Sequence, residues 1–345
     1  MRWENVYVAG LGTCLAEPTS ITSAVEAGLV DRGLGQALTD VYDYLSVIIA
    51  EDVAPPDMAV HAAQAALKDS GLAPSDFSLL LHGSTWFQGL DIWPAASYVA
   101  QRTLGPKVPA MDVQQRCNIG VSALDLAAAH LTSGQGDAVL ISIADRFCGP
   151  GADRWRLRHG TVYGDGAAAA VISRTGGFAR LLTTATLADN SLEALARGDE
   201  PFRTSPREAT DIIDLALRSD AGATRFEESE AVLRTFRLMQ RVVRKALSEA
   251  GLGIDDVHKL VVPANGRGEN GHHVFELLGF ERERTTWEYA RRTGHIGAGD
   301  WFAGLAHLVE TEAVSPGDRV VLWSAGAGFT ATAAVLEITD RLAEK

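Results

Sequence analysis

The chain has 345 residues, of which 46% are hydrophobic and 22% are charged, the balance of a globular protein with one or two domains. Its formal net charge of −13 argues against a nucleic-acid binder, and its longest apolar runs are far shorter than the roughly 20 residues of a membrane helix. Because the first residues contain no apolar signal-peptide core, we expect a cytoplasmic protein that binds neither membrane nor nucleic acid.

In chain order, one pattern occurs twice, at a spacing near 180 residues. It consists of a helix ended by glycine, a turn that contains an aspartate, and a buried strand. The two copies are residues 66–82, with Asp76 in the turn, and residues 246–263, with Asp256 in the turn.

A second pattern repeats at almost the same spacing. A short apolar strand follows a Gly-Asp turn at residues 136–141 and again at 317–322, and each leads to another apolar strand, at 167–172 and 331–338. Strands alternate with helices in both halves, which predicts two similar α/β halves whose mixed sheets are covered by helices.

The predicted boundaries divide the chain into three parts. Residues 1–180, which contain Cys117, are predicted to form an N-terminal half, and residues 241–345, which contain His295 and Asp300, a C-terminal half. Between them, residues 181–240 contain the charged segment 190–236, which breaks the repeat and predicts inserted helices and loops that act as a lid or a substrate wall.

The three cysteines, Cys14, Cys117 and Cys148, are an odd number without metal-ligand spacing, so we expect free thiols and no metal site. Cys117 precedes an alanine-rich segment, residues 118–131, with apolar residues at helical spacing. That segment places Cys117 at a helix N-terminus, where the helix dipole favours a thiolate. A lone cysteine can equally be a small buried apolar residue, and Cys14 and Cys148 are interpreted in this way.

Four segments resemble the ketoacyl synthase III group of the thiolase superfamily, in the same order along the chain. They are residues 6–12, 112–117, 163–168 and 326–330. The resemblance extends over nearly the whole length. It implies a duplicated α/β fold of five layers, αβαβα, with the catalytic nucleophile at Cys117. It also implies a homodimer, because duplicated halves of this fold usually pair across a central sheet.

Two positions depart from the Cys, His and Asn that condensing members of this group use. Ala264 stands in the place of the His, and His295 stands in the place of the Asn, with Asp300 five residues later. The set Cys117, His295 and Asp300 resembles a smaller branch of acyltransferases from antibiotic pathways. That branch includes a malonyltransferase that acylates a sugar hydroxyl, and starter-unit enzymes with Ser in place of Cys.

The resemblance implies a thioester on Cys117, with the backbone N–H groups of Cys117 and Ala327 as the oxyanion hole. His295 would then be the general base and acid, and Asp300 would fix its tautomer. The alternatives are that His295 is a solvent-facing loop residue and that Asp300 is a helix N-cap. Since position 264 has no imidazole to stabilise an enolate, we predict acyl transfer without decarboxylation.

The expected donor is an acyl-coenzyme A or an acyl carrier protein thioester, and no permanently bound cofactor is expected. The acceptor would be a small-molecule hydroxyl, for example on a glycoside of antibiotic or polyketide biosynthesis. Alternative functions are starter-unit transfer to an acyl carrier protein, a condensing ketoacyl synthase III reaction, and a non-catalytic subunit. The retained Cys117 with the His295–Asp300 pair argues against the last.

Three further features have two interpretations each. Arg158, in a run with Arg154 and Arg156, is the candidate contact to coenzyme A, and the alternative for the run is a solvated face. Trp86, Phe87 and Trp93 suit either a pocket wall or packing in the core or a dimer interface. Asp165, between two glycines, is predicted to accept backbone N–H groups in a structural turn.

Overall fold

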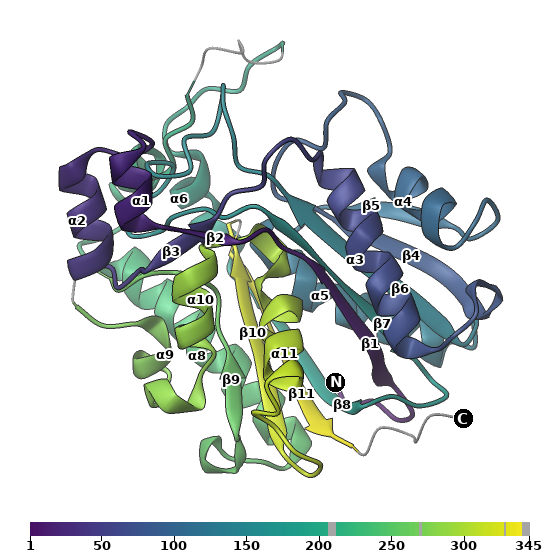
Figure 1. The fold of residues 1–345 in the computed structure, drawn as a ribbon. Coiled ribbons are helices and arrows are strands. Elements are labelled where there is room, and N and C mark those ends of the chain that lie inside the picture. The colour runs from purple at the N-terminus through teal and green to yellow at the C-terminus, as the bar shows by residue number, and fades with distance from the viewer. Residues whose placement is uncertain (206–211, 269–270, 328, 340–345) are drawn as a thin grey trace.

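The computed structural model describes residues 1–205, 212–268, 271–327 and 329–339. Figure 1 shows the blue N-terminal elements on one side of the molecule and the green C-terminal elements on the other, where the first two helices, in dark purple, also lie. The strands are β1 Tyr7–Cys14, β2 Pro18–Ser20, β3 Ser46–Ile48, β4 Phe77–Gly83, β5 Ala110–Val113, β6 Ala138–Asp145, β7 Gly166–Ser173, β8 Ala179–Ala188, β9 Lys259–Val261, β10 Arg319–Gly326 and β11 Thr330–Ile338. The helices are α1 Ile21–Glu26, α2 Arg32–Asp40, α3 Pro55–Ser70, α4 Ala95–Thr103, α5 Ile119–Thr132, α6 Ala194–Arg197, α7 Leu215–Ala223, α8 Glu230–Ala250, α9 Val274–Leu277, α10 Trp287–Thr293 and α11 Asp300–Glu310.

Nine strands are hydrogen-bonded side by side in the order β5-β4-β6-β7-β1-β8-β11-β10-β9. From the middle of the sheet outward, the strand pairings of the two halves correspond. In the N-terminal half β4 pairs parallel to β6, which pairs antiparallel to β7, and in the C-terminal half β9, β10 and β11 repeat this arrangement. The halves meet at a short antiparallel contact of β1 with β8. The predicted duplication is therefore present in the structure.

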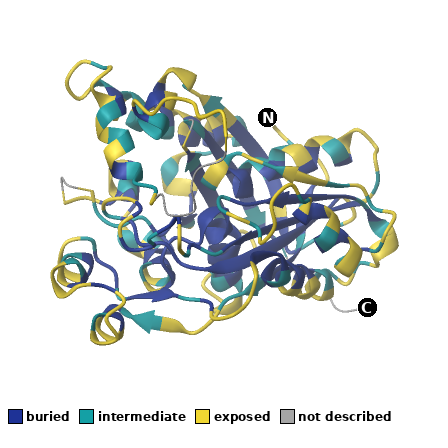
Figure 2. Ribbon diagram, turned by 90° about the horizontal axis from the view of Figure 1, so that it is seen from above, coloured by how far each residue is buried: buried dark blue, intermediate teal, exposed yellow. Residues whose placement is uncertain are grey.

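Three large apolar clusters separate five layers. One cluster lies between α3, α4 and the strands of the N-terminal half, and a second lies between α8 and the strands of the C-terminal half. The third joins α5 and α11 to strands of both halves, with Leu124, Trp301, Ile141 and Leu322 among its buried side chains. Figure 2 shows these central elements as dark blue, with exposed residues around them. The αβαβα arrangement predicted from the resemblance is confirmed.

The helix ends of the repeat have the predicted form. The helices α3 and α8 end at Gly71 and Gly251, whose φ values of 66° and 75° are left-handed and favour glycine. In the turns that follow, the side chains of Asp76 and Asp256 accept the backbone N–H three residues earlier, at 2.8 and 2.7 Å. Each turn then enters a buried strand, β4 or β9.

The segment between the halves is shorter than predicted. Strand β8 continues in the sheet to Ala188, and α8 begins at Glu230, so the helices and loops between them occupy residues 189–229 rather than 181–240. Residues 206–211 of this segment lie outside the described residues. Within the described residues, no helix combines the length and the apolar character that a membrane span requires.

The parallel strands β5, β4 and β6 bring three loops to one edge of the sheet, since the carboxyl ends of parallel neighbours lie together. These loops begin after Val113, Gly83 and Asp145. The hairpin between β10 and β11 and the N-terminus of α11 approach the same place from the second half. This meeting point holds the candidate site.

Candidate active site

The nucleophile candidate lies on a sharp turn between a strand and a helix. Cys117 is in a short 3₁₀ turn, Arg116–Asn118, that follows β5 and leads directly into α5, as predicted. Arg116 has φ 50°, a left-handed conformation that costs a non-glycine residue about 1 kcal/mol or more. The turn leaves Cys117 half-buried at the N-terminus of α5.

The structure brings the three predicted catalytic residues together. His295 Nε2 lies 3.1 Å from Cys117 Sγ, and His295 Nδ1 lies 2.6 Å from Asp300 Oδ2. His295 is 3% exposed and Asp300 is 6% exposed. A buried imidazole between a thiol and a carboxylate is the geometry of a nucleophile triad.

The backbone of a neighbouring segment fixes the position of His295. Its N–H donates to the carbonyl of Val162 at 2.8 Å, and its own carbonyl accepts the N–H of Gly164 at 3.0 Å. The imidazole packs against the ring of Tyr163, with 5.3 Å between ring centroids. The alternative of a solvent-facing loop histidine is therefore wrong.

Asp300 is held by backbone donors as well as by His295. Its Oδ1 accepts the N–H of Ile296 at 2.9 Å, and its Oδ2 accepts the N–H of Ala264 at 2.8 Å. The N-cap of α11 is Gly299, so the alternative of Asp300 as the N-cap is wrong. Ala264, where condensing members of the resembling group have a His side chain, instead uses its backbone to orient this carboxylate.

The charge of the site follows from its contacts. Burial by itself would lower the pKa of His295, but negative charge on Asp300 and Cys117 outweighs burial and holds this pKa well above the ordinary value of 6.5. The contacts of His295 therefore favour its imidazolium form.

Two hydrogen bonds connect the nucleophile turn to the β10–β11 hairpin of the other half. The hydroxyl of Ser324 donates to the carbonyl of Cys117 at 3.2 Å. The amide of the fully buried Asn118 donates to the hydroxyl of Thr332 at 3.1 Å. Sequence analysis missed Ser324 and Asn118, because their partners are more than 200 residues away along the chain.

The end of this hairpin packs directly on the turn. A Cβ on Gly326 would lie 2.5 Å from the carbonyl oxygen of Gln115, so only glycine permits this approach. Ala327, the next residue, is exposed, and Gly328 lies outside the described residues. The role of the Cys117 and Ala327 N–H groups as oxyanion donors stays a prediction.

A buried carboxylate that sequence analysis missed lies beside the triad. Asp145 ends β6 and accepts the N–H groups of Thr85 and Trp86, each at 2.7 Å. Burial raises the pKa of Asp145 to about 7, although the hydrogen bonds from these two N–H groups act in the opposite direction and lower it. A side chain at Gly297, two residues after His295, would overlap Asp145. The sequence signal that could have identified Asp145 is its position at the carboxyl end of a buried strand.

The arginine run divides into a buried and an exposed part. Arg154 is buried and donates to both carboxylate oxygens of Asp165, at 2.9 and 2.8 Å, so the interpretation of the run as a solvated face is wrong for this residue. Asp165 also accepts two backbone N–H groups, as predicted. Arg156 is exposed and pairs with surface carboxylates. Arg158 is exposed and pairs with no described carboxylate, and its contact to coenzyme A stays a prediction.

The inserted segment contributes to the wall beside His295. Ile213 and Leu215 of this segment, together with Trp86, pack against a small apolar cluster that contains Phe147, Ala152, Leu157 and Tyr163. The ring of Tyr163 contacts His295, so this cluster continues to the His295 imidazole. Trp93 packs elsewhere, against Tyr98, with 5.5 Å between ring centroids.

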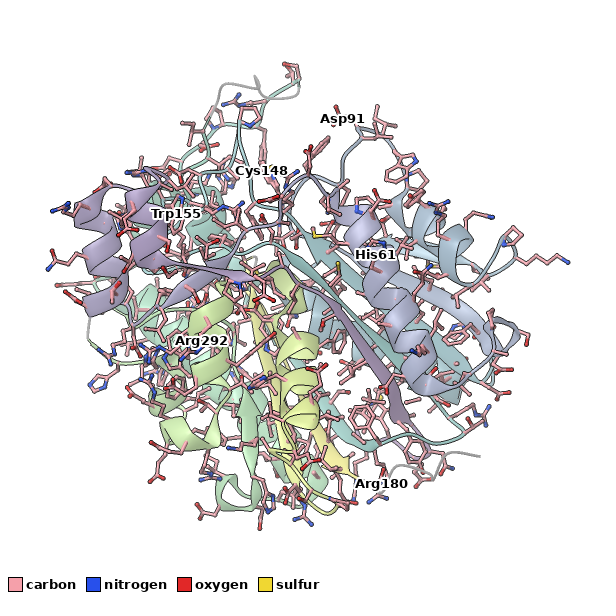
Figure 3. All side chains as sticks on the ribbon, viewed as in Figure 1. His61, Asp91, Cys148, Trp155, Arg180 and Arg292 are labelled. Atoms are coloured by element: carbon pink, nitrogen blue, oxygen red, sulfur yellow. The ribbon has the colours of Figure 1, made fainter. Side chains whose placement is uncertain are left out.

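The other two cysteines lie apart from the triad contacts. Cys14 Sγ is 3.9 Å from His61, and burial raises the pKa of its thiol, which disfavours a thiolate. Figure 3 shows His61 on α3, and Cys148 on the loops at the end of the molecule opposite Arg180. Within the described ranges, no three His, Cys, Asp or Glu residues are grouped to hold a metal ion.

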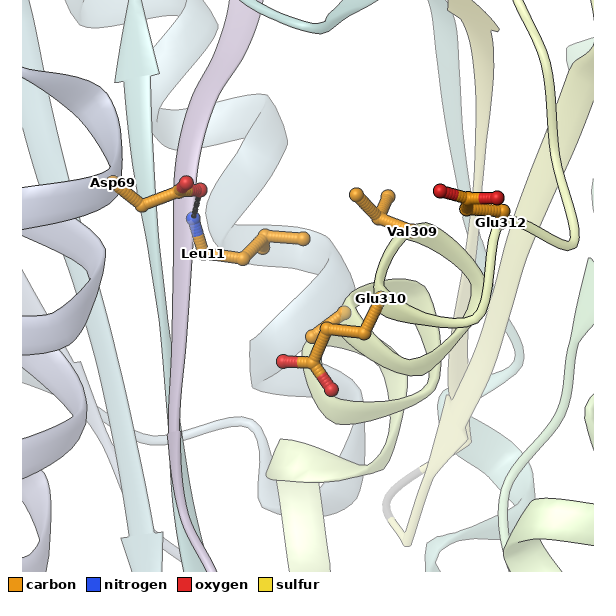
Figure 4. Close-up of a pocket in the computed structure, with 6 residues that line it drawn as sticks. Leu11, Asp69, Val309, Glu310 and Glu312 are labelled. Atoms are coloured by element: carbon orange, nitrogen blue, oxygen red, sulfur yellow. Dashed lines mark hydrogen bonds between the residues drawn. The ribbon is translucent and has the colours of Figure 1, made fainter.

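A surface pocket at the far end of α11 is separate from the site. It is lined by Leu11, Asp69, Ala306, Val309, Glu310 and Glu312, and Figure 4 shows the Leu11 N–H bonded to Asp69. Asp300 begins α11 and Glu310 ends it, which places them about 15 Å apart at 1.5 Å per residue. This acidic pocket is therefore not the place where an acyl group would meet Cys117.

Comparisons with known proteins find similar sequences and structures. Residues 111–190 match the 3-oxoacyl-[acyl-carrier-protein] synthase III family, and residues 247–338 match the C-terminal part of that family. The chain is 26% identical over 290 residues to the β-ketoacyl-[acyl-carrier-protein] synthase III of Aquifex aeolicus, covering 84% of this chain and 85% of the relative.

Solved structures extend the similarity over nearly the full length. The acyltransferase ChlB3 superposes with a TM-score of 0.90 at 34% identity, over 97% of this chain and 98% of that one. The 3-oxoacyl-[acyl-carrier-protein] synthase III from Aquifex aeolicus VF5 superposes with a TM-score of 0.75 at 22% identity, over 96% and 99% of the two chains, which is a likeness of fold.

Proposed function

We propose a specific reaction for this chain. The chain belongs to the ketoacyl synthase III-like branch of the thiolase superfamily and is therefore an acyltransferase. It moves an acyl group, intact, from a thioester donor through a thioester on Cys117 to a hydroxyl acceptor. One observation carries the proposal: His295 is bonded to both Cys117 and Asp300, while position 264 supplies a backbone N–H and no imidazole.

In the first half-reaction the donor acylates Cys117. The thiolate attacks the donor carbonyl, and the resulting oxyanion is stabilised by backbone N–H groups of the turn and the hairpin. The donor thiolate leaves and takes the proton of the His295 imidazolium. The products are a Cys117 thioester, a free donor thiol and a neutral imidazole.

In the second half-reaction the acceptor takes the acyl group. Acylation removes the negative charge of Cys117, one of the causes that raise the pKa of His295, so this pKa falls and the imidazole becomes available as a base. His295 removes the acceptor proton, the oxygen attacks the thioester, and Cys117 leaves as a thiolate. The imidazolium–thiolate pair is thereby restored.

The same geometry disfavours carbon–carbon bond formation. A condensing reaction that decarboxylates a malonyl group needs donors for the enolate oxygen. Ala264 contributes only a methyl group, its N–H is bonded to Asp300, and His295 is already bonded to Cys117 and Asp300. A malonyl group bound as a thioester on Cys117 would therefore keep its carboxylate.

The donor thioester is carried by coenzyme A or by an acyl carrier protein. Helix α8 favours an acyl carrier protein as the donor. Three of its arginines, Arg237, Arg241 and Arg244, are exposed and pair with no described carboxylate. The same helix would serve a carrier protein as acceptor, which is the starter-unit alternative. The hydroxyl of a sugar on a natural product is the acceptor that the resemblance favours.

The active form that we propose is a homodimer. Strand β5 lies at the edge of the sheet and exposes Met111, 55% accessible. The loop after β4 exposes Phe87, Leu90 and Ile92. An exposed edge strand beside apolar side chains supports pairing with a second copy.

The proposal is tested by the intact-protein mass after reaction with malonyl-coenzyme A. The native chain should gain a malonyl-sized mass, Cys117→Ala should gain none, and Cys14→Ala should behave as the native chain. An acetyl-sized gain would show decarboxylation and contradict intact transfer. Labelling that persists in Cys117→Ala would contradict the acyl-cysteine.

A further inference from the structure

The phenol of Tyr163 is a buried polar group beside the triad that neither half-reaction uses. The residue is 4% exposed, and among the described residues its hydroxyl has no hydrogen-bond partner. The fully buried Tyr44 shows the usual arrangement, because its hydroxyl donates to the carbonyl of Ala264 at 2.5 Å and accepts the N–H of Gly266 at 2.9 Å. Buried polar groups are normally paired, so the unpaired hydroxyl of Tyr163 needs an explanation.

The ring of Tyr163 is held in place from several directions. Its backbone N–H donates to the carbonyl of Arg154 at 3.0 Å, and its own carbonyl accepts Nη1 of Arg154 at 3.1 Å. The ring packs against Phe147, with 4.6 Å between centroids, and against the His295 imidazole, with 5.3 Å between centroids. The phenol therefore stays beside His295.

The charges that act on the phenol place its hydroxyl within the site. In order of effect they are the charges of Cys117, Arg158, Asp300 and Asp145. Burial and then the negative charge of Cys117 raise the pKa of the Tyr163 phenol, so the hydroxyl keeps its proton and is a donor. Within the described residues, Cys117 Sγ contacts His295 Nε2 and is not bonded to this hydroxyl.

Both half-reactions bring one substrate atom to the same place. The donor sulfur takes a proton from His295 Nε2 as it leaves the acyl carbon, and the acceptor oxygen gives a proton to Nε2 as it attacks that carbon. These two atoms therefore occupy the space beside Nε2 and Cys117 Sγ in turn. The hydroxyl of Tyr163 lies next to this space, because its ring contacts the imidazole and the charge of Cys117 acts on it most strongly.

We infer that Tyr163 is a catalytic residue of the second half-reaction, in which its phenol donates a hydrogen bond to the attacking oxygen and selects hydroxyl over thiol acceptors. The inference rests on the proposed function and adds the residue that chooses the acceptor. An alcohol oxygen has two lone pairs, so one accepts from Tyr163 while the other attacks the thioester. A sulfur atom is a weak hydrogen-bond acceptor and gains little from the phenol.

The step is balanced without any further reactant. The bond between the acceptor oxygen and the acyl carbon forms as the bond from that carbon to Cys117 Sγ breaks. The acceptor proton passes to His295, and Tyr163 keeps its own proton. Tyr163 thus positions the oxygen and leaves proton transfer to the imidazole.

The test is single-turnover transfer from the acyl-enzyme, followed by intact-protein mass spectrometry. The chain is acylated with malonyl- or acetyl-coenzyme A, separated from the donor, and mixed with methyl glucoside, with the thiol N-acetylcysteamine, or with buffer, where water is the acceptor. Tyr163→Phe keeps the ring and removes only the hydroxyl. This variant should be acylated at the native rate, and it should lose its acyl group to the two oxygen acceptors at least tenfold more slowly. Its transfer to N-acetylcysteamine should be unchanged.

The matched control is Tyr98→Phe. It also removes a single phenol hydroxyl, one that donates to Asp57 at 2.6 Å between helices α4 and α3. This variant should have the native rate constants for acylation and for transfer to all three acceptors.

The outcomes separate this inference from the function on which it rests. An equal fall for oxygen and thiol acceptors in Tyr163→Phe, slower acylation, or no change at all would overturn the role of Tyr163 and leave the acyl-cysteine proposal standing. A native acyl-enzyme that reacts with the thiol alone, or with none of the acceptors, would overturn the inference and the hydroxyl acceptor together. Absence of any adduct on the native chain would contradict the acyl-cysteine itself.

Discussion

At the scale of single residues, the geometry of the site depends on which hydrogen-bond donors each carboxylate oxygen of Asp300 accepts. One carboxylate oxygen accepts the N–H of Ile296, and the other accepts both the N–H of Ala264 and Nδ1 of His295. Three donors hold this carboxylate, and among the described residues its ion-pair partner is His295. Its orientation and its charge thus both act on the imidazole.

Asp300→Asn should lower the acylation rate by roughly 10²–10⁴-fold, because an amide in either orientation directs its NH₂ group at a donor. The raised pKa of His295 keeps the imidazolium protonated above pH 6.5, so native acylation should fall only as pH rises through that raised value. Without the Asp300 charge the pKa of His295 drops, and this descending limb should move to lower pH by about one unit or more.

The measurement is the pH profile of Cys117 acylation. Asp318→Asn, which removes the carboxylate 3.2 Å from the exposed His258, is the matched control and should leave the profile unchanged. A superimposable profile for native and Asp300→Asn would show that Asp300 does not set the pKa of His295.

At the scale of elements, α8 differs in charge from the rest of the chain. It carries four arginines and a lysine against two glutamates, in a chain with a net charge of −13. Near its start, Arg234 pairs with Asp189, whose N–H donates to the carbonyl of Phe329 in the β10–β11 hairpin. The basic face of α8 therefore begins beside the proposed oxyanion loop and runs away from it.

Reversing the three exposed charges, Arg237→Glu, Arg241→Glu and Arg244→Glu together, should weaken binding of a holo acyl carrier protein at least tenfold. The physical reason is that carrier proteins are acidic, and opposite charge accelerates and stabilises their encounter with a basic face. Isothermal titration at two salt concentrations measures the effect, which should shrink at high salt.

The matched control for the helix is the triple variant Lys68→Glu, Lys107→Glu and Arg174→Glu, which changes the net charge equally at exposed positions of the other half. Equal affinity of both triple variants for the carrier protein would rule out α8 as its binding face. Acylation by coenzyme A thioesters should be unaffected in both.

At the scale of the whole molecule, the duplicated halves supply different parts of one site. The N-terminal half provides Cys117 at the start of α5, and the C-terminal half provides His295, Asp300 and the hairpin. The central apolar cluster around α5 and α11 holds these parts together, so loss of packing there would separate the Cys117 thiol from the His295 imidazole. The sheet edge at β5 remains open for a second copy.

The native chain should have twice the mass of a single chain in light scattering at micromolar concentration. Leu90→Glu with Ile92→Glu should shift it to the mass of one chain, because two charges would replace apolar side chains that a partner covers. Leu29→Glu with Val41→Glu, also exposed and apolar but distant in sequence from β5, should remain dimeric. A native chain with the mass of one molecule would contradict the dimer.

The sequence by itself determined the features that depend on local order. Helix ends at Gly71 and Gly251, the alternation of helix and strand, and the placement of Cys117 before α5 follow from neighbouring residues, and each is found in the structure. The family resemblance added His295 and Asp300, which the structure brings within hydrogen-bonding distance of one another.

Only the tertiary structure decided which polar groups meet across the two halves. His295 Nε2 beside Cys117 Sγ, the Asn118 amide on the Thr332 hydroxyl, and the Ser324 hydroxyl on the Cys117 carbonyl join residues 178 to 214 positions apart in sequence. Such contacts leave no periodic signal, because burial and charge pairing depend on how β-strands and helices of both halves pack. For that reason the sequence located the candidate nucleophile, while the fold determined which charged groups surround it.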